Sequence, residues 1–179
     1  MTLPIAAITA ALTCAACAGD VCRVRLVRPE RDGSTVTEWG SGTAVGQRLL
    51  VTCNHVVSGP GRVEVEIAGA WRAATVERTD ADVDLALLKV QADVEPFAFL
   101  ALPKLTVSAS AESAPVAESA AAIRELTITG AFHNGQSGGA VALETGELVA
   151  IIRAIEPGPR ATYATCIPAS AVKAFLDKP

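Results

Sequence analysis

The first half of the chain, from residue 21 to residue 90, is a succession of short apolar runs with no helical run between them. In the run at residues 21–27, apolar residues alternate with arginines, so one face is apolar and the other is charged. Turn signals such as Pro60-Gly61 and Gly69 separate the runs. Short strands at this spacing, joined by turns, predict an antiparallel β-barrel.

After Pro96 the second half is again made of short apolar runs, without an internal sequence repeat. The first half is expected to hold strands at residues 21–27, 35–39, 42–45, 49–52, 63–67, 71–77 and 85–90, and the second half strands at 97–102, 105–110, 123–129, 140–143, 148–155 and 162–167. Residues 108–121 are rich in Ala and Ser and predict a loop. A short helix is expected at residues 169–177, with Ser170 as its cap. The expected organisation is a first barrel at residues 20–93 and a second at 94–168.

Composition limits the classes of protein to which the chain can belong. Of its 179 residues, 50% are hydrophobic and 19% are charged, which excludes a disordered chain and suits one modest domain or two halves that share a core. The net charge is −4, and the densest basic group, Arg23, Arg25, Arg28 and Arg31, alternates along one strand as a solvated face would. We therefore predict no nucleic-acid partner. No run reaches the roughly 18 to 20 apolar residues of a membrane span.

The cysteines predict neither a metal site nor a disulfide framework. Their number is five, so at least one thiol is unpaired within the chain. Cys14, Cys17 and Cys22 cluster, but structural zinc needs four ligands and neither histidine lies nearby in the sequence. Cys53 and Cys166 fall inside apolar runs, where a reduced cysteine serves as a small core residue. This usage favours a reducing compartment, and hence a cytoplasmic location.

A serine stands between glycines in the string Asn134-Gly135-Gln136-Ser137-Gly138-Gly139. A nucleophilic serine needs a presented hydroxyl and nearby backbone N–H groups that stabilise a tetrahedral oxyanion. Glycines allow the tight turn that points the N–H groups of Gly135 and Ser137 at one spot. The alternative interpretation of this string is a glycine-rich β-turn without chemistry.

Two residues of matching chemistry lie upstream, each beside an apolar strand. His55 follows the strand at 49–52, and Asp84 directly precedes the strand at 85–90. The order His, Asp, Ser is the one that a Ser-His-Asp constellation takes in chymotrypsin-type barrels. Asp80 and Asp82 compete for the acidic role, and Asp84 is preferred because it immediately precedes the strand. The alternative for His55 is a histidine that merely ends a strand.

Six short strings in the same order resemble the trypsin-like serine peptidases, most closely their bacterial HtrA-like branch. The resemblance covers roughly residues 20 to 177. The matching strings are Gly40-Ser41-Gly42-Thr43-Ala44-Val45, Thr52-Cys53-Asn54-His55-Val56-Val57, Asp84-Leu85-Ala86-Leu87-Leu88, Gly135-Gln136-Ser137-Gly138-Gly139, Gly146-Glu147-Leu148-Val149-Ala150-Ile151 and Ile167-Pro168. The stretch from Asp84 to Ser137 is much shorter than in most relatives, which implies short loops in the second barrel.

The resemblance implies an all-β fold of two packed six-stranded antiparallel barrels with a short C-terminal helix. It also implies a helix over residues 1–19, where apolar residues recur at helical spacing. The alternative for that segment is a secretory signal ending at Ala16-Cys17-Ala18, which would make the protein secreted or periplasmic. Against the signal, no Lys or Arg precedes Arg23.

The resemblance implies a serine endopeptidase with His55, Asp84 and Ser137 as its catalytic residues. The oxyanion would lie between the N–H groups of Gly135 and Ser137, and neither a metal nor a cofactor is expected. The substrate would be a protein or peptide. The alternative is a protease-fold module whose closed site serves as a binding or regulatory surface, and native esterase activity would use the same acyl-transfer chemistry.

The resemblance also suggests which residues surround the substrate. They are Ala131, Phe132, His133 and Asn134 before the serine, and Ile152, Arg153 and Ala154 on the opposite wall. No aspartate occupies the position that makes trypsin select basic residues, so trypsin-like specificity is not expected. Arg153 replaces a smaller residue and could attract acidic substrates or block the site.

Gln136 stands where the digestive enzymes have an aspartate that receives a newly cleaved N-terminal amine. Activation by N-terminal insertion is therefore not expected, and control would come from loop order, a partner or a larger assembly. No PDZ-like segment follows the peptidase-like region, so the sequence resembles a free-standing module or a protease domain of something larger.

Overall fold

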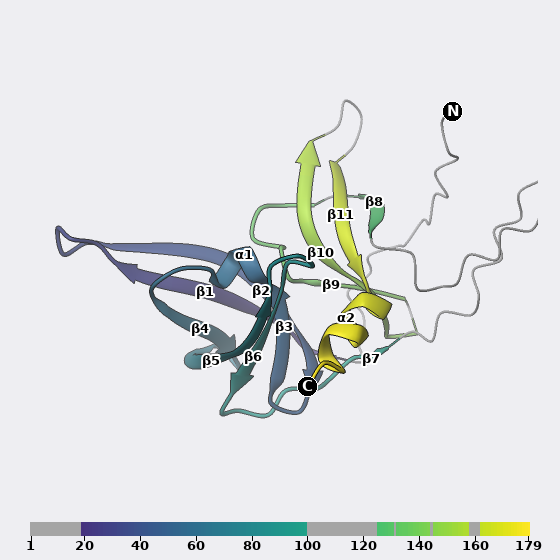
Figure 1. The fold of residues 1–179 in the computed structure, drawn as a ribbon, viewed down its shortest axis with the longest axis horizontal. Helices are drawn as coiled ribbons and strands as arrows, with labels where there is room; N and C mark the ends of the chain where they lie inside the picture. The colour runs from purple at the N-terminus through teal and green to yellow at the C-terminus, as the bar shows by residue number, and fades with distance from the viewer. Residues whose placement is uncertain (1–18, 100–124, 131, 144, 158–161) are drawn as a thin grey trace, which may run out of the picture.

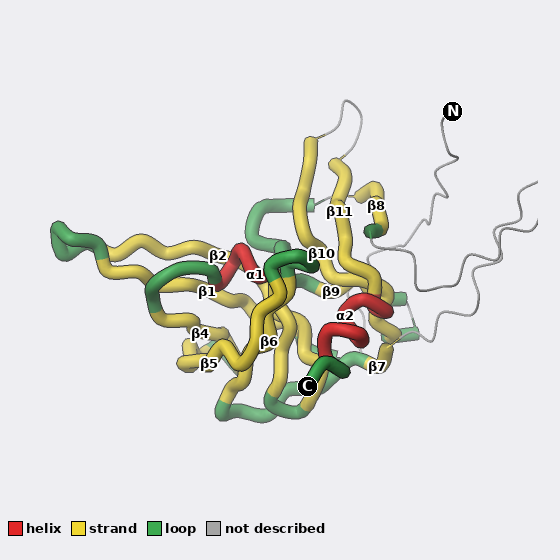
Figure 2. The backbone as a smooth tube through the Cα atoms, in the orientation of Figure 1, coloured by secondary structure: helices red, strands yellow, loops and turns green. Residues whose placement is uncertain are grey.

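The computed structural model describes residues 19–99, 125–130, 132–143, 145–157 and 162–179 (Figure 1). Strands dominate these residues, and the helices among them are short (Figure 2). The elements are β1 (Val21–Pro29), β2 (Thr35–Gly46), β3 (Leu49–Cys53), α1 (Asn54–Val57), β4 (Arg62–Ile67), β5 (Ala70–Asp80), β6 (Leu85–Val90), β7 (Ala98–Phe99), β8 (Leu126–Gly130), β9 (Ala140–Ala142), β10 (Glu147–Pro157), β11 (Thr162–Pro168) and α2 (Ala169–Leu176). The predicted all-β class is confirmed. The expected helix over residues 1–19 lies outside the described residues except for Gly19, and the strand at 105–110 and the loop at 108–121 lie outside them entirely.

The first half of the chain closes into a six-stranded barrel, as predicted. Its strands neighbour one another in the order β1-β2-β3-β6-β5-β4, and β4 pairs back onto β1. Every pair is antiparallel. The separate strands expected at 35–39 and 42–45 are one continuous strand, β2, which pairs with β1 from Pro29↔Thr35 to Val21↔Thr43.

Gly40 lies inside β2 because the strand passes very close to α1. A Cβ at Gly40 would lie 2.6 Å from a methyl group of Val56. The glycine is therefore required by close packing and does not end the strand. The sequence pattern shows one run before Gly40 and another from Gly42 onward, so it predicts two strands. Pairing with β1 continues across both glycines and makes them one strand.

The barrel core is built from alternate residues of each strand. In β1, Cys22, Val24 and Leu26 point inward and are buried, whereas Arg23 is exposed. The buried side chains of the other strands complete the same core, among them Leu50, Val51, Val65, Leu85, Leu88 and Val90. Burying each Val or Leu side chain stabilises the fold by roughly 1.5–3 kcal/mol. This cluster therefore stabilises the barrel as a whole.

The outer face of β1 carries arginines that pair with aromatic rings and carboxylates. The guanidinium of Arg25 lies 4.1 Å from the ring centroid of Trp71, and its Nε donates to Glu64 at 2.7 Å. Arg23 lies 5.1 Å from the ring centroid of Trp39, and the two indoles meet edge to face with centroids 5.5 Å apart. Half of the Trp39 surface stays exposed, so this is the partly solvated face that the alternation predicted.

Of the predicted second six-stranded barrel, the described residues form a five-stranded sheet in the order β7-β10-β11-β8, with β9 also paired to β10. Its pairs are antiparallel except that β7 runs parallel to β10. Antiparallel β10 and β11 form its longest pair and stand together beyond the first barrel (Figure 1). A bulge in β10 between Ile152 and Ala154 leaves Arg153 without a partner residue on β11. Bulges re-aim side chains, and this one lies next to the candidate site.

The C-terminal helix packs on both halves of the molecule. Val172 and Phe175 of α2 are buried, and the helix contacts β6, β10 and β11. Arg78 of β5 donates to the carbonyl oxygen of Phe175 at 2.5 Å, where helical carbonyls lack an internal partner. The prediction of Ser170 as the cap is wrong: β11 runs directly into the helix, Pro168 is the N-cap residue and no side chain caps the helix.

Candidate active site

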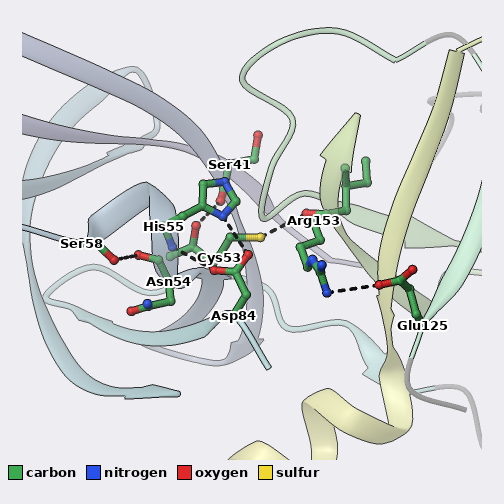
Figure 3. Close-up of polar contacts among 10 residues, drawn as sticks. Ser41, Cys53, Asn54, His55, Ser58, Asp84, Glu125 and Arg153 are labelled. Carbon is green, nitrogen blue, oxygen red and sulfur yellow. Dashed lines mark hydrogen bonds and ion pairs between the residues drawn. The ribbon is translucent and has the colours of Figure 1, made fainter. Parts of the chain in front are cut away.

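His55 and Asp84 meet because β3 and β6 are neighbouring strands of the first barrel. Cys53, the last residue of β3, lies opposite Leu85, the first residue of β6. His55 follows Cys53 in α1, and Asp84 immediately precedes Leu85. This register places Nδ1 of His55 2.7 Å from Oδ2 of Asp84 (Figure 3). The strand pairing therefore creates a contact between residues 29 positions apart.

The contact with Asp84 fixes which nitrogen of the imidazole carries hydrogen. An ionised carboxylate only accepts hydrogen bonds, so Nδ1 of His55, which faces Oδ2, must be the donor. In the neutral ring, Nε2 is then left as an acceptor. The His55 side chain is 52% exposed, so this acceptor can reach a group outside the barrel.

Asp84 is held by the backbone of α1 as well as by the ring of His55. Its Oδ1 accepts from the His55 N–H at 2.9 Å, and its carbonyl oxygen accepts from the Asn54 N–H at 3.1 Å. Its backbone is in the left-handed region, with φ of 62°. Such a conformation costs of order 1–3 kcal/mol in a non-glycine residue, and the surrounding hydrogen bonds offset that cost.

The loop that carries Ser137 is attached to both halves of the molecule. Gly138 N–H donates to the carbonyl of Ile152 at 2.7 Å, and Ile152 N–H donates to Gly139 at 2.9 Å, which ties the loop to β10. Ser41 N–H of β2 donates to the carbonyl of Ser137 at 2.8 Å. The candidate nucleophile thus lies where the two halves meet, beside the strand that runs next to β3.

Gly138 is the most tightly enclosed residue of this loop. Its φ is 91°, and a Cβ there would lie 2.0 Å from the carbonyl oxygen of Ser41 and 2.5 Å from Oγ1 of Thr52. Both the conformation and the space demand glycine. Gly135 has a similar φ of 90°, but a Cβ there would meet no atom within 4 Å.

Ser137 itself is half-buried. Among the described residues, no hydrogen bond joins its hydroxyl to the ring of His55. In enzymes of this chemistry such a bond is often long in the empty site and tightens when substrate binds. The structure therefore places Asp84 in direct contact with His55, and it places the loop of Ser137 against β2, the strand next to β3.

The residues expected around the substrate fall into different environments. Ala131 lies outside the described residues, and His133 and Asn134 are exposed. Phe132 and Ile152 are buried in the core of the second sheet. The N–H of His133 donates to Oε1 of Gln136 at 2.7 Å, so the side chain of Gln136 folds back on its own loop.

Arg153 projects from the bulge of β10 and forms an ion pair with Glu125. The two groups are 3.2 Å apart, and both side chains are partly exposed, at 40% and 48% (Figure 3). Ala154, its neighbour, is half-buried. The partner of Arg153 was not found from the sequence, because Glu125 lies far away in the chain and carries no pattern of its own.

Two hydroxyl residues of β2 were also missed as contributors to the site. Thr43 Oγ1 donates to the carbonyl of Gly138 at 2.9 Å, and Ser41 Oγ donates to the carbonyl of Gly135 at 2.8 Å. Their spacing of two residues, on either side of Gly42, puts both on one face of the strand. The sequence offered two signals for them: this alternation, and their place in the string at residues 40–45 that resembles the family.

Cys53, His55 and Asp84 offer donor atoms within 4.8 Å of one another. The Cys53 thiol is fully buried and donates to the carbonyl of Ile152 at 3.3 Å. Burial, reinforced by the charge of Asp84, raises the pKa of this thiol far above its ordinary value. A metal would need the thiolate form of Cys53, which the raised pKa disfavours. His55 and Asp84 are already hydrogen-bonded to each other, so we assign no metal to these three residues.

Comparisons with known proteins identify the family and the fold of the chain. The family model for the trypsin-like peptidase domain matches residues 40–151, and the chain therefore belongs to that family. Among solved structures, the chain is similar to the active form of the Rv3671c protease from M. tuberculosis. That match has a TM-score of 0.67 and 19% sequence identity, and it covers 90% of this chain and 81% of that one. No curated protein matches the chain in sequence.

The predicted family and the chymotrypsin-like fold are thus confirmed, and the protein is a trypsin-like peptidase. Within the described residues, no helix combines the length and the apolar character needed to cross a bilayer.

Proposed function

We propose that the chain is a serine endopeptidase in which His55, Asp84 and Ser137 form the catalytic triad. The observation that carries the proposal is the paired contact of Asp84 with His55, at 2.7 Å to the ring and 2.9 Å to the backbone, in a trypsin-like peptidase. Asp84 keeps the hydrogen on Nδ1, so Nε2 is free to take a proton from a serine hydroxyl.

In the first step the hydroxyl oxygen of Ser137 attacks the carbonyl carbon of the scissile peptide bond. Its proton moves to Nε2 of His55, and the negative charge of the tetrahedral intermediate gathers on the former carbonyl oxygen. The N–H groups of Gly135 and Ser137 would donate to that oxyanion. Asp84 stabilises the imidazolium that forms.

The intermediate then collapses to an acyl-enzyme. The carbon–nitrogen bond breaks, and His55 gives its proton to the departing amine. Water next attacks the ester carbonyl, again with His55 as the base, and the acid product leaves while Ser137 recovers its hydrogen. These steps balance with side chains, water and substrate alone.

The substrates would be proteins or peptides, as the family implies. Of the expected pocket residues, Arg153 offers a positive charge beside the site, and His133 and Asn134 offer exposed polar groups. The exchangeable ion pair of Arg153 with Glu125 favours acidic substrate side chains over basic ones. This supports the expectation that specificity is not trypsin-like.

A fluorophosphonate probe tests the proposal, because it phosphonylates a serine only when the triad activates it. We expect the native chain to be labelled at Ser137, and Ser137→Ala and His55→Ala to lose labelling while they remain folded. Ser34→Ala, in the exposed turn between β1 and β2, is the matched control and should label normally. Peptide cleavage by the native chain, mapped by mass spectrometry, would then separate an endopeptidase from an esterase.

A folded native chain that the probe does not label would contradict a constitutively active serine peptidase. The surviving interpretation would be the closed protease-fold module that acts through binding, and labelling would be repeated with candidate activating proteins present. Labelling without peptide cleavage would instead favour the esterase.

A further inference from the structure

Ser41 of β2 holds the loop that contains Ser137 at two points. Its N–H donates to the carbonyl of Ser137, and its hydroxyl donates to the carbonyl of Gly135, each at 2.8 Å. The two acceptors stand on either side of Gln136 and are about 94 positions from Ser41 in the chain. One residue of the first barrel therefore brackets the tripeptide whose N–H groups would stabilise the oxyanion.

The position of Ser41 is itself fixed from the barrel. Its carbonyl oxygen accepts from Oγ1 of Thr52 at 2.7 Å, and Thr52 belongs to β3, two residues before α1. Ser41 is half-buried, whereas Thr52 is fully buried. The hydroxyl of Ser41 thus extends from a rigid strand next to the one that leads to His55.

The two ends of the loop differ in what holds them. Gly138 is enclosed by packing, since a Cβ there would overlap the backbone of Ser41. Gly135 has open space on its Cβ side, so packing does not restrict its backbone there. Among the described residues, this end is held by the hydroxyl of Ser41 and, inside the loop, by two contacts of His133 with Gln136: His133 N–H donates to Oε1 of Gln136 at 2.7 Å, and Gln136 N–H donates to the His133 carbonyl at 3.3 Å. Of these, Ser41 supplies the connection to the first barrel.

We propose that Ser41 is a positioning residue for catalysis, whose hydroxyl fixes the peptide plane after Gly135 and so keeps the oxyanion-binding N–H groups aimed at the substrate. The proposal rests on the proposed function. Glycine tolerates a wide range of backbone angles, so the two peptide planes that flank Gly135 can rotate at little cost. Loss of the bond from the Ser41 hydroxyl to the Gly135 carbonyl would therefore also free the N–H of Gly135. The backbone bond from Ser41 to Ser137 persists in any variant except proline, and only the hydroxyl is specific to serine.

The expected signature is a loss in turnover with little change in substrate affinity. Oxyanion donors act mainly on the transition state, so misplacing them lowers kcat and leaves KM nearly unchanged. Loss of a whole donor costs about 10²–10³ in kcat, and a misaligned donor is expected to cost about 10–100-fold.

The test compares Ser41→Ala and Ser41→Cys with the native chain, using steady-state cleavage of a peptide substrate and the rate of fluorophosphonate labelling. Cysteine keeps a similar volume but is a weak donor, so it covers the case in which the alanine variant fails to fold. Both variants should lose about 10–100-fold in kcat and in labelling rate, with KM within about threefold of native.

Thr43→Val is the matched control, because it also removes a cross-barrel hydrogen bond to this loop, but at the packed Gly138. It should lower the thermal midpoint while kcat falls much less than in the Ser41 variants. Native kcat in a folded Ser41→Cys, or equal kcat losses in Thr43→Val and Ser41→Cys, would overturn the proposal. An unlabelled native chain would instead refute the proposed function, so the two failures are distinguishable.

Discussion

Asp84 binds His55 twice, through the imidazole and through the backbone N–H, so a single carboxylate sets both the orientation of the ring and the start of α1. Asp84 makes both contacts from a left-handed backbone conformation, with φ of 62°. The ring and its support are thus fixed before any substrate arrives, which is the preorganisation that acid–base catalysis requires.

Asp84→Asn should remove activity while it preserves the fold. Its amide oxygen can still accept from the His55 backbone, but the amide no longer favours the hydrogen on Nδ1, so we expect kcat to fall about 10³–10⁴-fold. Peptide cleavage and thermal unfolding, measured together, check this. Asp82→Asn, an exposed carboxylate in the same turn, is the control. Similar losses in both variants would contradict the special role of Asp84.

Gly138→Ala should destabilise the fold far more than Gly135→Ala. Both residues have φ near 90°, so each alanine pays the left-handed penalty of about 1–2 kcal/mol. Only at Gly138 would the new methyl group overlap backbone, 2.0 Å from the Ser41 oxygen. Chemical denaturation of the two variants measures the difference. Equal free energies of unfolding would show that the loop does not pack against β2 as the structure has it.

Acid should weaken the attachment of the C-terminus to the first barrel. Lys178 donates to Asp80 at 2.6 Å, and this hydrogen bond, with backbone N–H donors from the following turn, lowers the pKa of Asp80. A carboxyl whose folded pKa lies below its unfolded value near 3.9 stabilises the fold above that value, and this stability is lost as pH falls through the folded pKa.

Unfolding midpoints between pH 2 and pH 7 should therefore fall less in Asp80→Asn than in the native chain. Lys178→Met should have an effect of the same sign, and the double variant should add little to either single change. A native acid dependence in Asp80→Asn would rule out this linkage.

The buried thiols should not react while the chain is folded. Burial raises the pKa of Cys22 to about 11 and that of Cys166 to about 12, and Cys53 is fully buried as well. In a variant with Cys14 and Cys17 replaced by serine, we expect a disulfide reagent at pH 7.5 to modify no thiol in the native state and three in guanidinium. Rapid native-state modification would contradict the core location that the sequence also predicted for Cys53 and Cys166.

Arg153 should influence substrate choice. A partly exposed ion pair is worth about 0.2–1 kcal/mol, so Arg153 can exchange Glu125 for an acidic substrate side chain at little cost. Arg153→Ala should lower kcat/KM for acidic peptides about 3–10-fold relative to neutral ones. Glu125→Gln, which releases the arginine, should shift the same ratio the other way. Profiling with a peptide library measures both, and an unchanged ratio in both variants would remove Arg153 from the specificity residues.

The sequence by itself determined the fold class and the candidate residues. Alternation along β1 and the turns between short runs encode a barrel, because side-chain direction in a strand has a period of two and is set locally. The strings around His55, Asp84 and Ser137 are local as well, so residue type and order sufficed to single them out.

Tertiary structure decided which of these residues meet, and what supports them. Three aspartates precede β6, and the register of β3 with β6 brings Asp84 to His55, while Asp80 reaches Lys178. The continuity of β2 and the contact of Ser41 with Gly135 also arise from pairing between distant segments. Such contacts depend on strand register and on the docking of one half against the other. Local periodicity predicts neither the register nor the docking, because the same alternating pattern is compatible with more than one pairing of strands.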